Sequence, residues 1–407
     1  MLFQKIPCPY NRLTMATKKK WTKFRHKAVF RLFHPIFSLY SRIHYGYTAK
    51  KFQMAKGQNY LILCNHSCGL DPFFVSLSFP GKPVYFVASD DLLRIRFASF
   101  WIKWAAAPIP KKKDIADYRF LPICQQIAKE GGNIGIFPEG NRTYSGHLGP
   151  LDQGIAKLAK SLGLPVLLYS ISNGYGVDPR WGTKRRKGKM QGEVRCLLSG
   201  EEVASLSEQE LLKIIENSIT SPLKHDFLYK SKRRAEHLER VLYVCPKCKK
   251  MQTLSSKGNL LRCKCGLEAT YEENMTFSSS DPSFPFHTVM DWYAFQKEFV
   301  SSLPLPDGPI FADEAVEVLF SRHDGPKKVI RKGTLTMGVN GFAHDNYLDE
   351  WKLPFASIYG VGITGKNKIV CYTRDGDSYT FRGKASFNAY KYAQMHAKIM
   401  MRLEESL

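Results

Sequence analysis

Short apolar runs alternate with amphipathic stretches from about Asn59 to Ser199. Over residues 152–163 the apolar positions recur at i, i+3, i+4 and i+7, which predicts a helix that ends at Gly163, before Pro165. This alternation of strand and helix is typical of an α/β domain with a mostly parallel sheet. The predicted strands cover residues 60–64, 84–88, 133–137, 165–170 and 194–198.

The pattern changes after residue 200. The chain first becomes highly charged, and from Asp313 onward strand-like segments are joined by hairpin turn signals at Asn340-Gly341 and Asp375-Gly376. A bent sheet closed by one C-terminal helix resembles a pleckstrin-homology-like module in topology alone. Further helices are predicted over residues 201–239, 288–303 and 387–405.

At 407 residues the chain is too long for one ordinary core, so several domains are expected. We predict a basic amphipathic segment, an α/β domain, a cysteine-rich ribbon, and a linker helix followed by a β-rich domain. In that order they cover residues 1–50, 51–240, 241–277 and 278–407.

Positive charge dominates, with 60 Lys and Arg against 36 Asp and Glu, a formal net charge of +24. No acidic residue precedes Asp71, so the N-terminal segment is purely basic. A field of this sign attracts polyanions, either nucleic acid or an anionic membrane surface.

The basic segment also contains an amphipathic stretch over residues 27–43, which we expect Pro35 to divide into two short helices. This stretch packs on the following domain, or it inserts apolar side chains below lipid headgroups, and the two roles are compatible. The side chains expected to insert are Phe30, Phe33, Ile36 and Phe37.

No apolar run approaches the roughly 20 residues that cross a bilayer, and the first residues lack the apolar core of a signal peptide. We therefore expect a peripheral protein on the cytoplasmic face of the membrane. The ten cysteines would then stay reduced unless they bind metal.

A polar cluster follows the first predicted strand, where Asn65 and His66 precede Asp71 across a turn that contains Gly69. Such a turn can bring the carboxylate back to the imidazole, fix its tautomer and let the other nitrogen accept a proton. A histidine at this place can equally be a structural residue with all its hydrogen bonds satisfied.

A second cluster follows the strand over residues 133–137, where Glu139 and Arg142 flank the flexible Gly140. The guanidinium fork of arginine suits phosphate oxygens, so Arg142 is a candidate phosphate ligand. Glu139 is better suited to orient Arg142 or a substrate hydroxyl. The alternative for both residues is a local salt bridge that closes a loop.

Together these clusters resemble the glycerolipid acyltransferase family of 1-acylglycerol-3-phosphate acyltransferases. The family motif N-H-x-x-x-x-D is matched in full by Asn65, His66 and Asp71. The motif F-P-E-G-T-R is matched by Phe137, Pro138, Glu139, Gly140 and Arg142, with Asn141 in place of threonine.

Two weaker family motifs are also present. A basic residue after a short apolar strand corresponds to Lys111, where arginine is customary, and an apolar strand corresponds to the segment around Pro165. The resemblance covers about residues 50–221, roughly half the chain.

The resemblance implies an O-acyltransferase that acts on a lysophospholipid, most favourably 1-acylglycerol-3-phosphate. His66, oriented by Asp71, would deprotonate the acceptor hydroxyl, while Arg142 and Lys111 hold the phosphate. The acyl donor is acyl-CoA, acyl-carrier protein or an acyl phosphate, and no catalytic cofactor is expected. Oxyanion donors are expected among the backbone N–H groups near Gly140.

Four cysteines form a separate motif. Cys245 and Cys248 are a C-x-x-C pair, and Cys263 and Cys265 follow as a C-x-C pair after fourteen residues. Four thiolates at this spacing predict one closed, structural zinc site. The alternative is a redox-active C-x-x-C pair with two incidental cysteines.

A zinc ribbon together with the high positive charge also suggests a nucleic-acid-binding protein. That alternative leaves His66, Asp71 and Arg142 without a role, and the basic residues mix with Phe and Ile rather than lining a base-stacking face. We therefore expect an anionic membrane and lipid substrates as partners, and no nucleic acid.

Overall fold

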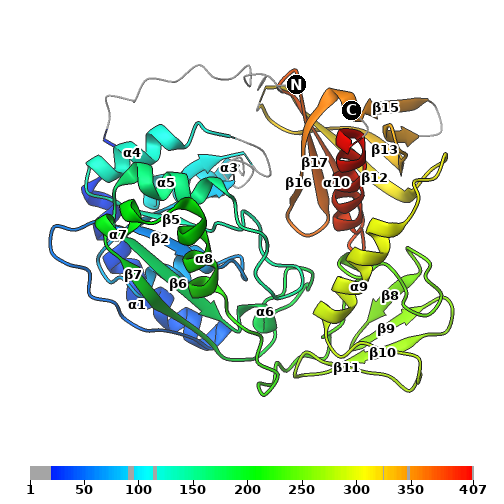
Figure 1. Ribbon diagram of the computed structural model, residues 1–407, viewed down its shortest axis with the longest axis horizontal. Coiled ribbons are helices and arrows are strands. Elements are labelled where there is room, and N and C mark those ends of the chain that lie inside the picture. The colour runs from blue at the N-terminus through cyan, green and yellow to red at the C-terminus, as the bar shows by residue number, and fades with distance from the viewer. Residues whose placement is uncertain (1–19, 90–95, 113–116, 324, 346–348, 406–407) are drawn as a thin grey trace.

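The structure is a computed structural model that describes residues 20–89, 96–112, 117–323, 325–345 and 349–405. Its strands form three sheets, and Figure 1 shows the first beside the other two. The first sheet belongs to the α/β part, the second to the cysteine-rich segment, and the third to the C-terminal part. The α/β fold and the additional β-rich C-terminal region confirm the predicted fold class.

The first sheet has seven strands in the order β1-β7-β6-β2-β5-β3-β4. Its neighbouring strands are parallel except for the antiparallel pair β6 and β7. All five predicted strands occur, and β1 adds an edge that the sequence did not indicate. The strands are β1 (Tyr47–Ala49), β2 (Leu61–Cys64), β3 (Val84–Ser89), β4 (Ile109–Lys111), β5 (Asn133–Ile136), β6 (Val166–Ser172) and β7 (Met190–Leu198).

Helices cover both faces of this sheet because its strands are apolar on both sides. Leu61 and Leu63 point into the core beneath α4, α5 and α8, while Ile62 and Cys64 point toward α1 and α2. The helices of this part are α1 (Phe24–Tyr45), α2 (Asp71–Ser76), α3 (Arg96–Ala105), α4 (Leu121–Lys129), α5 (Gly154–Leu162), α6 (Gly174–Val177), α7 (Gly200–Ser205) and α8 (Glu208–Ile219).

Helix α1 runs without interruption through Pro35, so the predicted break into two helices is wrong. Proline removes one hydrogen bond from the helix, and packing on both sides of Pro35 holds the two halves in line. Before it, His26 contacts the Tyr85 hydroxyl at 3.1 Å; after it, Phe37 packs on Phe73. Residues 1–19 of the predicted N-terminal segment lie outside the described residues.

Phe37 is buried against the core, so its predicted insertion into lipid is also wrong. Phe33 and Ile36 of the predicted set are exposed, and Ile36 belongs to a row of exposed apolar side chains at helical spacing on the outward face of α1, with Leu32, Leu39 and Ile43. Among the described helices, none is long and apolar enough to cross a bilayer.

The helix predicted over residues 201–239 is correct only as far as Ile219. Beyond it the chain crosses toward the second sheet, with one short 3₁₀ turn at Leu238–Arg240. Residues 230–237 are strongly cationic and lack an apolar stripe, so nothing favours a helix there. Arg234 instead donates to the carbonyl of Tyr271 at 2.9 Å, which ties this crossing to the second sheet.

The second sheet has four antiparallel strands. The strands are β8 (Leu254–Lys257), β9 (Leu260–Cys263), β10 (Glu268–Tyr271) and β11 (Phe277–Ser278). Tyr271 packs edge-on against Trp181 of the α/β part, with ring centroids 5.9 Å apart. The cysteine-rich segment therefore shares a core with the α/β part.

Helix α9 (Val289–Ser302) leads to the third sheet, which has seven antiparallel strands in the order β15-β14-β13-β12-β18-β17-β16. The strands are β12 (Phe311–Ser321), β13 (Lys328–Met337), β14 (Gly341–Asp345), β15 (Glu350–Pro354), β16 (Ile358–Thr364), β17 (Lys368–Thr373) and β18 (Ser378–Arg382). Helix α10 (Ala389–Glu405) packs across this sheet (Figure 1), and both predicted hairpin turns are present.

Candidate active site

His66 lies just beyond the carboxyl end of β2, and its ring is fixed on two sides. Its Nδ1 lies 2.8 Å from Oδ2 of Asp71. One face of the imidazole stacks on Phe137, with centroids 4.3 Å apart and the planes 23° apart. The turn over residues 67–70 therefore returns the carboxylate to the ring, as the spacing predicted.

Asp71 is itself held by backbone N–H groups of the turn that precedes it. The same Oδ2 accepts hydrogen bonds from the N–H groups of Ser67 at 2.7 Å and Cys68 at 2.8 Å, and the side chain is fully buried. The loop is thus wrapped around the carboxylate. A carboxylate fixed in this way can hold the imidazole in one tautomer.

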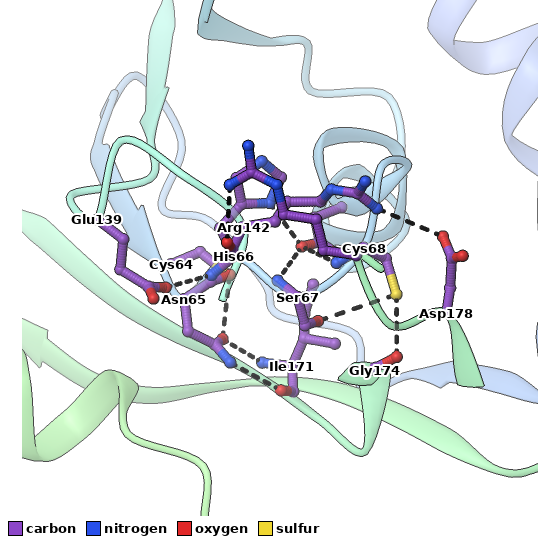
Figure 2. A network of polar contacts seen from close by, with 12 residues as sticks. Cys64, Asn65, His66, Ser67, Cys68, Glu139, Arg142, Ile171, Gly174 and Asp178 are labelled. Carbon is purple, nitrogen blue, oxygen red and sulfur yellow. Dashed lines mark hydrogen bonds and ion pairs between the residues drawn. The ribbon is translucent and has the colours of Figure 1, made fainter. Parts of the chain in front are cut away.

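Asn65 faces β6 rather than the groove beside His66. Its amide nitrogen donates to the carbonyl of Ile171 at 2.9 Å, and its Oδ1 accepts from the N–H of Ile171 at 2.7 Å. Figure 2 shows this paired contact below the His66 backbone. The geometry suits Asn65 to hold the loop in place, whereas the sequence predicted a substrate contact.

Glu139 also holds backbone. Its Oε1 accepts from the N–H of His66 at 2.6 Å, and its Oε2 accepts from the N–H of Gly149 at 2.8 Å. Burial raises the pKa of the Glu139 carboxyl to about 7, against the lowering effect of these two donors. These contacts suit Glu139 to hold the backbone of His66, while its predicted role in orienting Arg142 or a substrate hydroxyl stays a prediction.

Arg142 extends across the opening above His66, and its guanidinium points toward Asp178 (Figure 2). The nearest atoms, Nη1 and Oδ2, are 3.7 Å apart. The loops that carry His66 and Arg142 also meet directly, because the N–H of Thr143 donates to the carbonyl of His66 at 2.9 Å. Nothing in the local sequence pattern pointed to Asp178.

A groove of about 930 Å³ opens beside His66 and Arg142. Lys111, at the end of β4, lies on its rim with Nζ 3.2 Å from Oδ2 of Asp152 and 5.0 Å from the centroid of the Phe120 ring. Gly140 also lines the groove, but its own N–H already donates to the carbonyl of Phe137. The apolar lining includes Val87, Phe120, Leu121, Ile136, Phe137, Ile155, Leu158 and Leu212.

Two cysteines next to His66 are poor nucleophiles. Cys64 and Cys68 are fully buried, and burial raises the pKa of both thiols. A buried thiol that resists ionisation supplies little thiolate, which is the reactive form.

The four cysteines of the predicted metal site come together at one end of the second sheet: Cys245 and Cys248 precede β8, Cys263 ends β9, and Cys265 follows it. Their sulfur atoms all lie within 4.8 Å of one another. Cys245 and Cys265 have sulfurs 3.7 Å apart, and those of Cys248 and Cys263 are 3.8 Å apart. The cluster can hold a metal ion.

Comparisons with known proteins agree with the motifs. Residues 47–172 match the Acyltransferase family model. A 1-acyl-sn-glycerol-3-phosphate acyltransferase of Borreliella burgdorferi is 30% identical over 122 residues, 29% of this chain and 48% of that protein. The chain thus spans about half the length of that relative.

Two further likenesses carry similar descriptions. A 1-acyl-sn-glycerol-3-phosphate acyltransferase of Bacillus subtilis is 25% identical over 177 residues, 42% of this chain and 87% of that protein. The crystal structure of the 1-acyl-sn-glycerophosphate (LPA) acyltransferase PlsC from Thermotoga maritima has a TM-score of 0.41 and 21% identity, covering 49% of this chain and 80% of that one.

Proposed function

We propose that this protein is an acyltransferase that moves a fatty acyl group to the free hydroxyl of a lysophospholipid, with 1-acylglycerol-3-phosphate as the favoured acceptor and phosphatidate as the product. The observation that carries this proposal is the His66–Asp71 pair at the edge of a large, mostly apolar groove. The two relatives from Borreliella burgdorferi and Bacillus subtilis are described as 1-acyl-sn-glycerol-3-phosphate acyltransferases, which is the activity proposed for this protein.

His66 acts as the general base. With Nδ1 directed at Asp71, Nε2 takes the proton from the acceptor hydroxyl as its oxygen attacks the acyl carbonyl carbon. The new ester C–O bond forms, the bond to the thiol or phosphate leaving group breaks, and the imidazolium returns the proton to that leaving group. The Asp71 carboxylate stabilises the imidazolium between these steps.

Arg142 binds the phosphate of the acceptor, and Lys111 adds a second positive charge from the opposite rim. Both lie on the groove, and each pairs with a carboxylate, Asp178 or Asp152, that a phosphate dianion would displace. The apolar side chains further along the groove, from Phe137 to Leu158 and Leu212, suit a fatty acyl chain. We make no choice between acyl-CoA, acyl-carrier protein and acyl phosphate as the donor.

The cysteine cluster holds one structural zinc ion. A tetrahedral site with zinc–sulfur bonds of about 2.3 Å has sulfurs about 3.8 Å apart, close to the separations of 3.7 Å for Cys245 and Cys265 and 3.8 Å for Cys248 and Cys263. Cys245, Cys248, Cys263 and Cys265 supply all four ligands. When bound, zinc supplies folding energy to the second sheet and leaves no position open for a substrate.

The protein attaches peripherally to an anionic membrane through α1 and α3. The exposed row on α1 lies beside basic side chains such as Arg31 and Arg42, and α3 exposes Phe100 and Trp101. An amphipathic surface of this kind binds lipid interfaces, and its basic residues contribute on the order of 1 kcal/mol each.

The test is a transfer assay with purified protein. Lysophosphatidate is supplied with acyl-CoA, acyl-carrier protein or acyl phosphate, and phosphatidate is measured by mass spectrometry. We expect product with at least one donor, and binding to anionic vesicles rather than to RNA in co-sedimentation. No product with any donor, together with binding to RNA alone, contradicts the proposal and favours the nucleic-acid alternative.

A further inference from the structure

The β16–β17 turn of the third sheet reaches the catalytic groove, although it lies about 200 residues beyond the family motifs. Gly365, in this turn, is one of the groove-lining residues. Figure 1 shows the β16–β17 hairpin extending from the C-terminal part toward the loops of the α/β part. The match to the Acyltransferase family model covers residues 47–172, so the turn lies outside the matched stretch.

Hydrogen bonds fix the turn to the loop that carries Arg142. The Arg180 guanidinium is buried and donates to the carbonyl of Ile363 in β16 at 3.2 Å. The same guanidinium donates to Oδ1 of Asn141 at 3.0 Å and to the carbonyl of Arg142 at 3.1 Å. One side chain therefore joins the catalytic loop to the third sheet.

A second set of contacts surrounds this joint. Lys366, in the turn, donates to the carbonyl of Gly182. On the other side, Nζ of Lys112 lies 5.8 Å from the centroid of the Tyr372 ring in β17. Arg180 and Lys366 therefore hold the turn in a fixed position relative to Arg142, and the Tyr372 contact lies at the far end of β17.

The charges around the turn are mostly positive. Burial lowers the pKa of the Lys366 ammonium, nearby Asp178 raises it, and the positive charges of Arg142 and Arg240 lower it. Arg142 pairs with Asp178, Arg240 donates to the carbonyl of Trp181, and Lys366 donates to that of Gly182, so the three cations share one neighbourhood in which Asp178 offsets part of their charge. A compact anion in the groove beside Gly365 would relieve this repulsion.

We propose that the β16–β17 turn is the wall of the acceptor site beside Arg142, and that it restricts the groove to a small phosphate-monoester head group. This inference rests on the proposed function, because it takes the lysophospholipid acceptor from there. The cations behind the wall favour a dianion and disfavour a head group that ends in a cation, and the fixed turn limits the room beyond the phosphate.

Gly365 offers a direct way to alter the wall. It has a φ of +65°, and a Cβ built on it meets no atom within 4 Å. Asparagine and aspartate tolerate this left-handed conformation better than other side chains. Gly365→Asn adds bulk at the wall, and Gly365→Asp adds nearly the same bulk with a negative charge.

The matched control is Gly376→Asp in the β17–β18 turn, where φ is +85°. The two turns lie at opposite ends of β17, about 20 Å apart for a strand of six residues. The control therefore places the same charge on the same sheet, away from the wall at Gly365.

The experiment measures KM and kcat with lysophosphatidate and with lysophosphatidylcholine. We expect the wild type to prefer lysophosphatidate. The KM for lysophosphatidate should rise about tenfold more in Gly365→Asp than in Gly365→Asn, because the added negative charge removes a charge-assisted contact to the phosphate. Gly376→Asp should stay within about twofold of the wild type, because its turn lies about 20 Å from the Gly365 turn, which is more than a Debye length. An unchanged KM in both Gly365 variants contradicts the proposed role of the turn as the wall of the acceptor site and leaves the proposed function intact.

Binding of glycerol 3-phosphate, measured by calorimetry, separates the two hypotheses. If no lysophospholipid is acylated, the proposed function fails, but weaker binding in Gly365→Asp than in Gly376→Asp still supports the wall. Equal binding by the two variants, or no binding by the wild type, overturns it.

Discussion

The groove and the cysteine cluster are both built on loops, but they use opposite means of holding their side chains. In the groove, the backbone N–H groups of Ser67 and Cys68 hold Asp71, and Asp71 holds His66. In the cluster, the four sulfurs face one another. The groove therefore keeps its shape when a reactive side chain is replaced, whereas the cluster depends on its side chains for its fold.

Loss of metal should have the largest effect, because structural zinc contributes on the order of 10 kcal/mol to the folding of small sites. Chelation, or Cys263→Ser, should unfold residues 244–277, seen as loss of hydrogen-exchange protection there. Since Tyr271 packs on Trp181, acyl transfer should fall in part rather than vanish. Elemental analysis that finds well under one zinc per chain would instead rule out the metal site.

Asp71→Asn should have the second-largest effect, a loss of turnover of up to about 10⁴-fold, as for the carboxylate of a catalytic triad. The amide disturbs the tautomer of His66 but keeps the size of the side chain. Turnover of lysophosphatidate and thermal unfolding are measured together. A variant that keeps both its fold and its turnover contradicts the role of the His66–Asp71 pair.

Glu139 should make stability depend on pH. Burial raises the pKa of its carboxyl from 4.5 to about 7, so the folded protein holds this proton more tightly than the unfolded chain. The contribution of Glu139 to stability is complete below about pH 4.5 and is lost as the pH rises through about 7, by on the order of 3 kcal/mol. Urea unfolding of wild type and Glu139→Gln at about pH 4.5 and pH 8 checks this.

The wild type should lose more stability across that range than Glu139→Gln, which has no proton to release at this position. Parallel losses in the two proteins would place the pH dependence elsewhere.

Arg142→Lys should have the smallest effect, an increase in the KM for lysophosphatidate of about tenfold, because lysine keeps the charge but loses the fork. The kcat should change much less. If KM stays the same, the phosphate site lies elsewhere on the rim, and Lys111→Met becomes the next variant to measure.

The local part of this architecture could be predicted from the sequence. The strands and the return of Asp71 to His66 depend on residues close in the chain, and the structure places them as the pattern indicated. The helix predicted over residues 230–239 failed because charge alone does not define an apolar face. The break at Pro35 failed because tertiary packing outweighs one lost hydrogen bond.

The long-range part could not be predicted. Asp178 meets Arg142, and Ile363 meets Arg180, across 36 and 183 residues of sequence, and no periodicity encodes such pairs. The backbone partners of Asn65 and Glu139, Ile171 and Gly149, could not be predicted for the same reason. A family motif identifies such residues but does not say which of them brace the site.

The most direct test of the central claim is the turnover of lysophosphatidate by His66→Ala, with His323→Ala on the third sheet as the matched control. We predict that His66→Ala makes no detectable phosphatidate while its fold and vesicle binding stay unchanged, because the base is gone and its supports remain. The control should act like the wild type. If His66→Ala keeps more than a few per cent of wild-type turnover, His66 is not the base and the account of the groove is wrong.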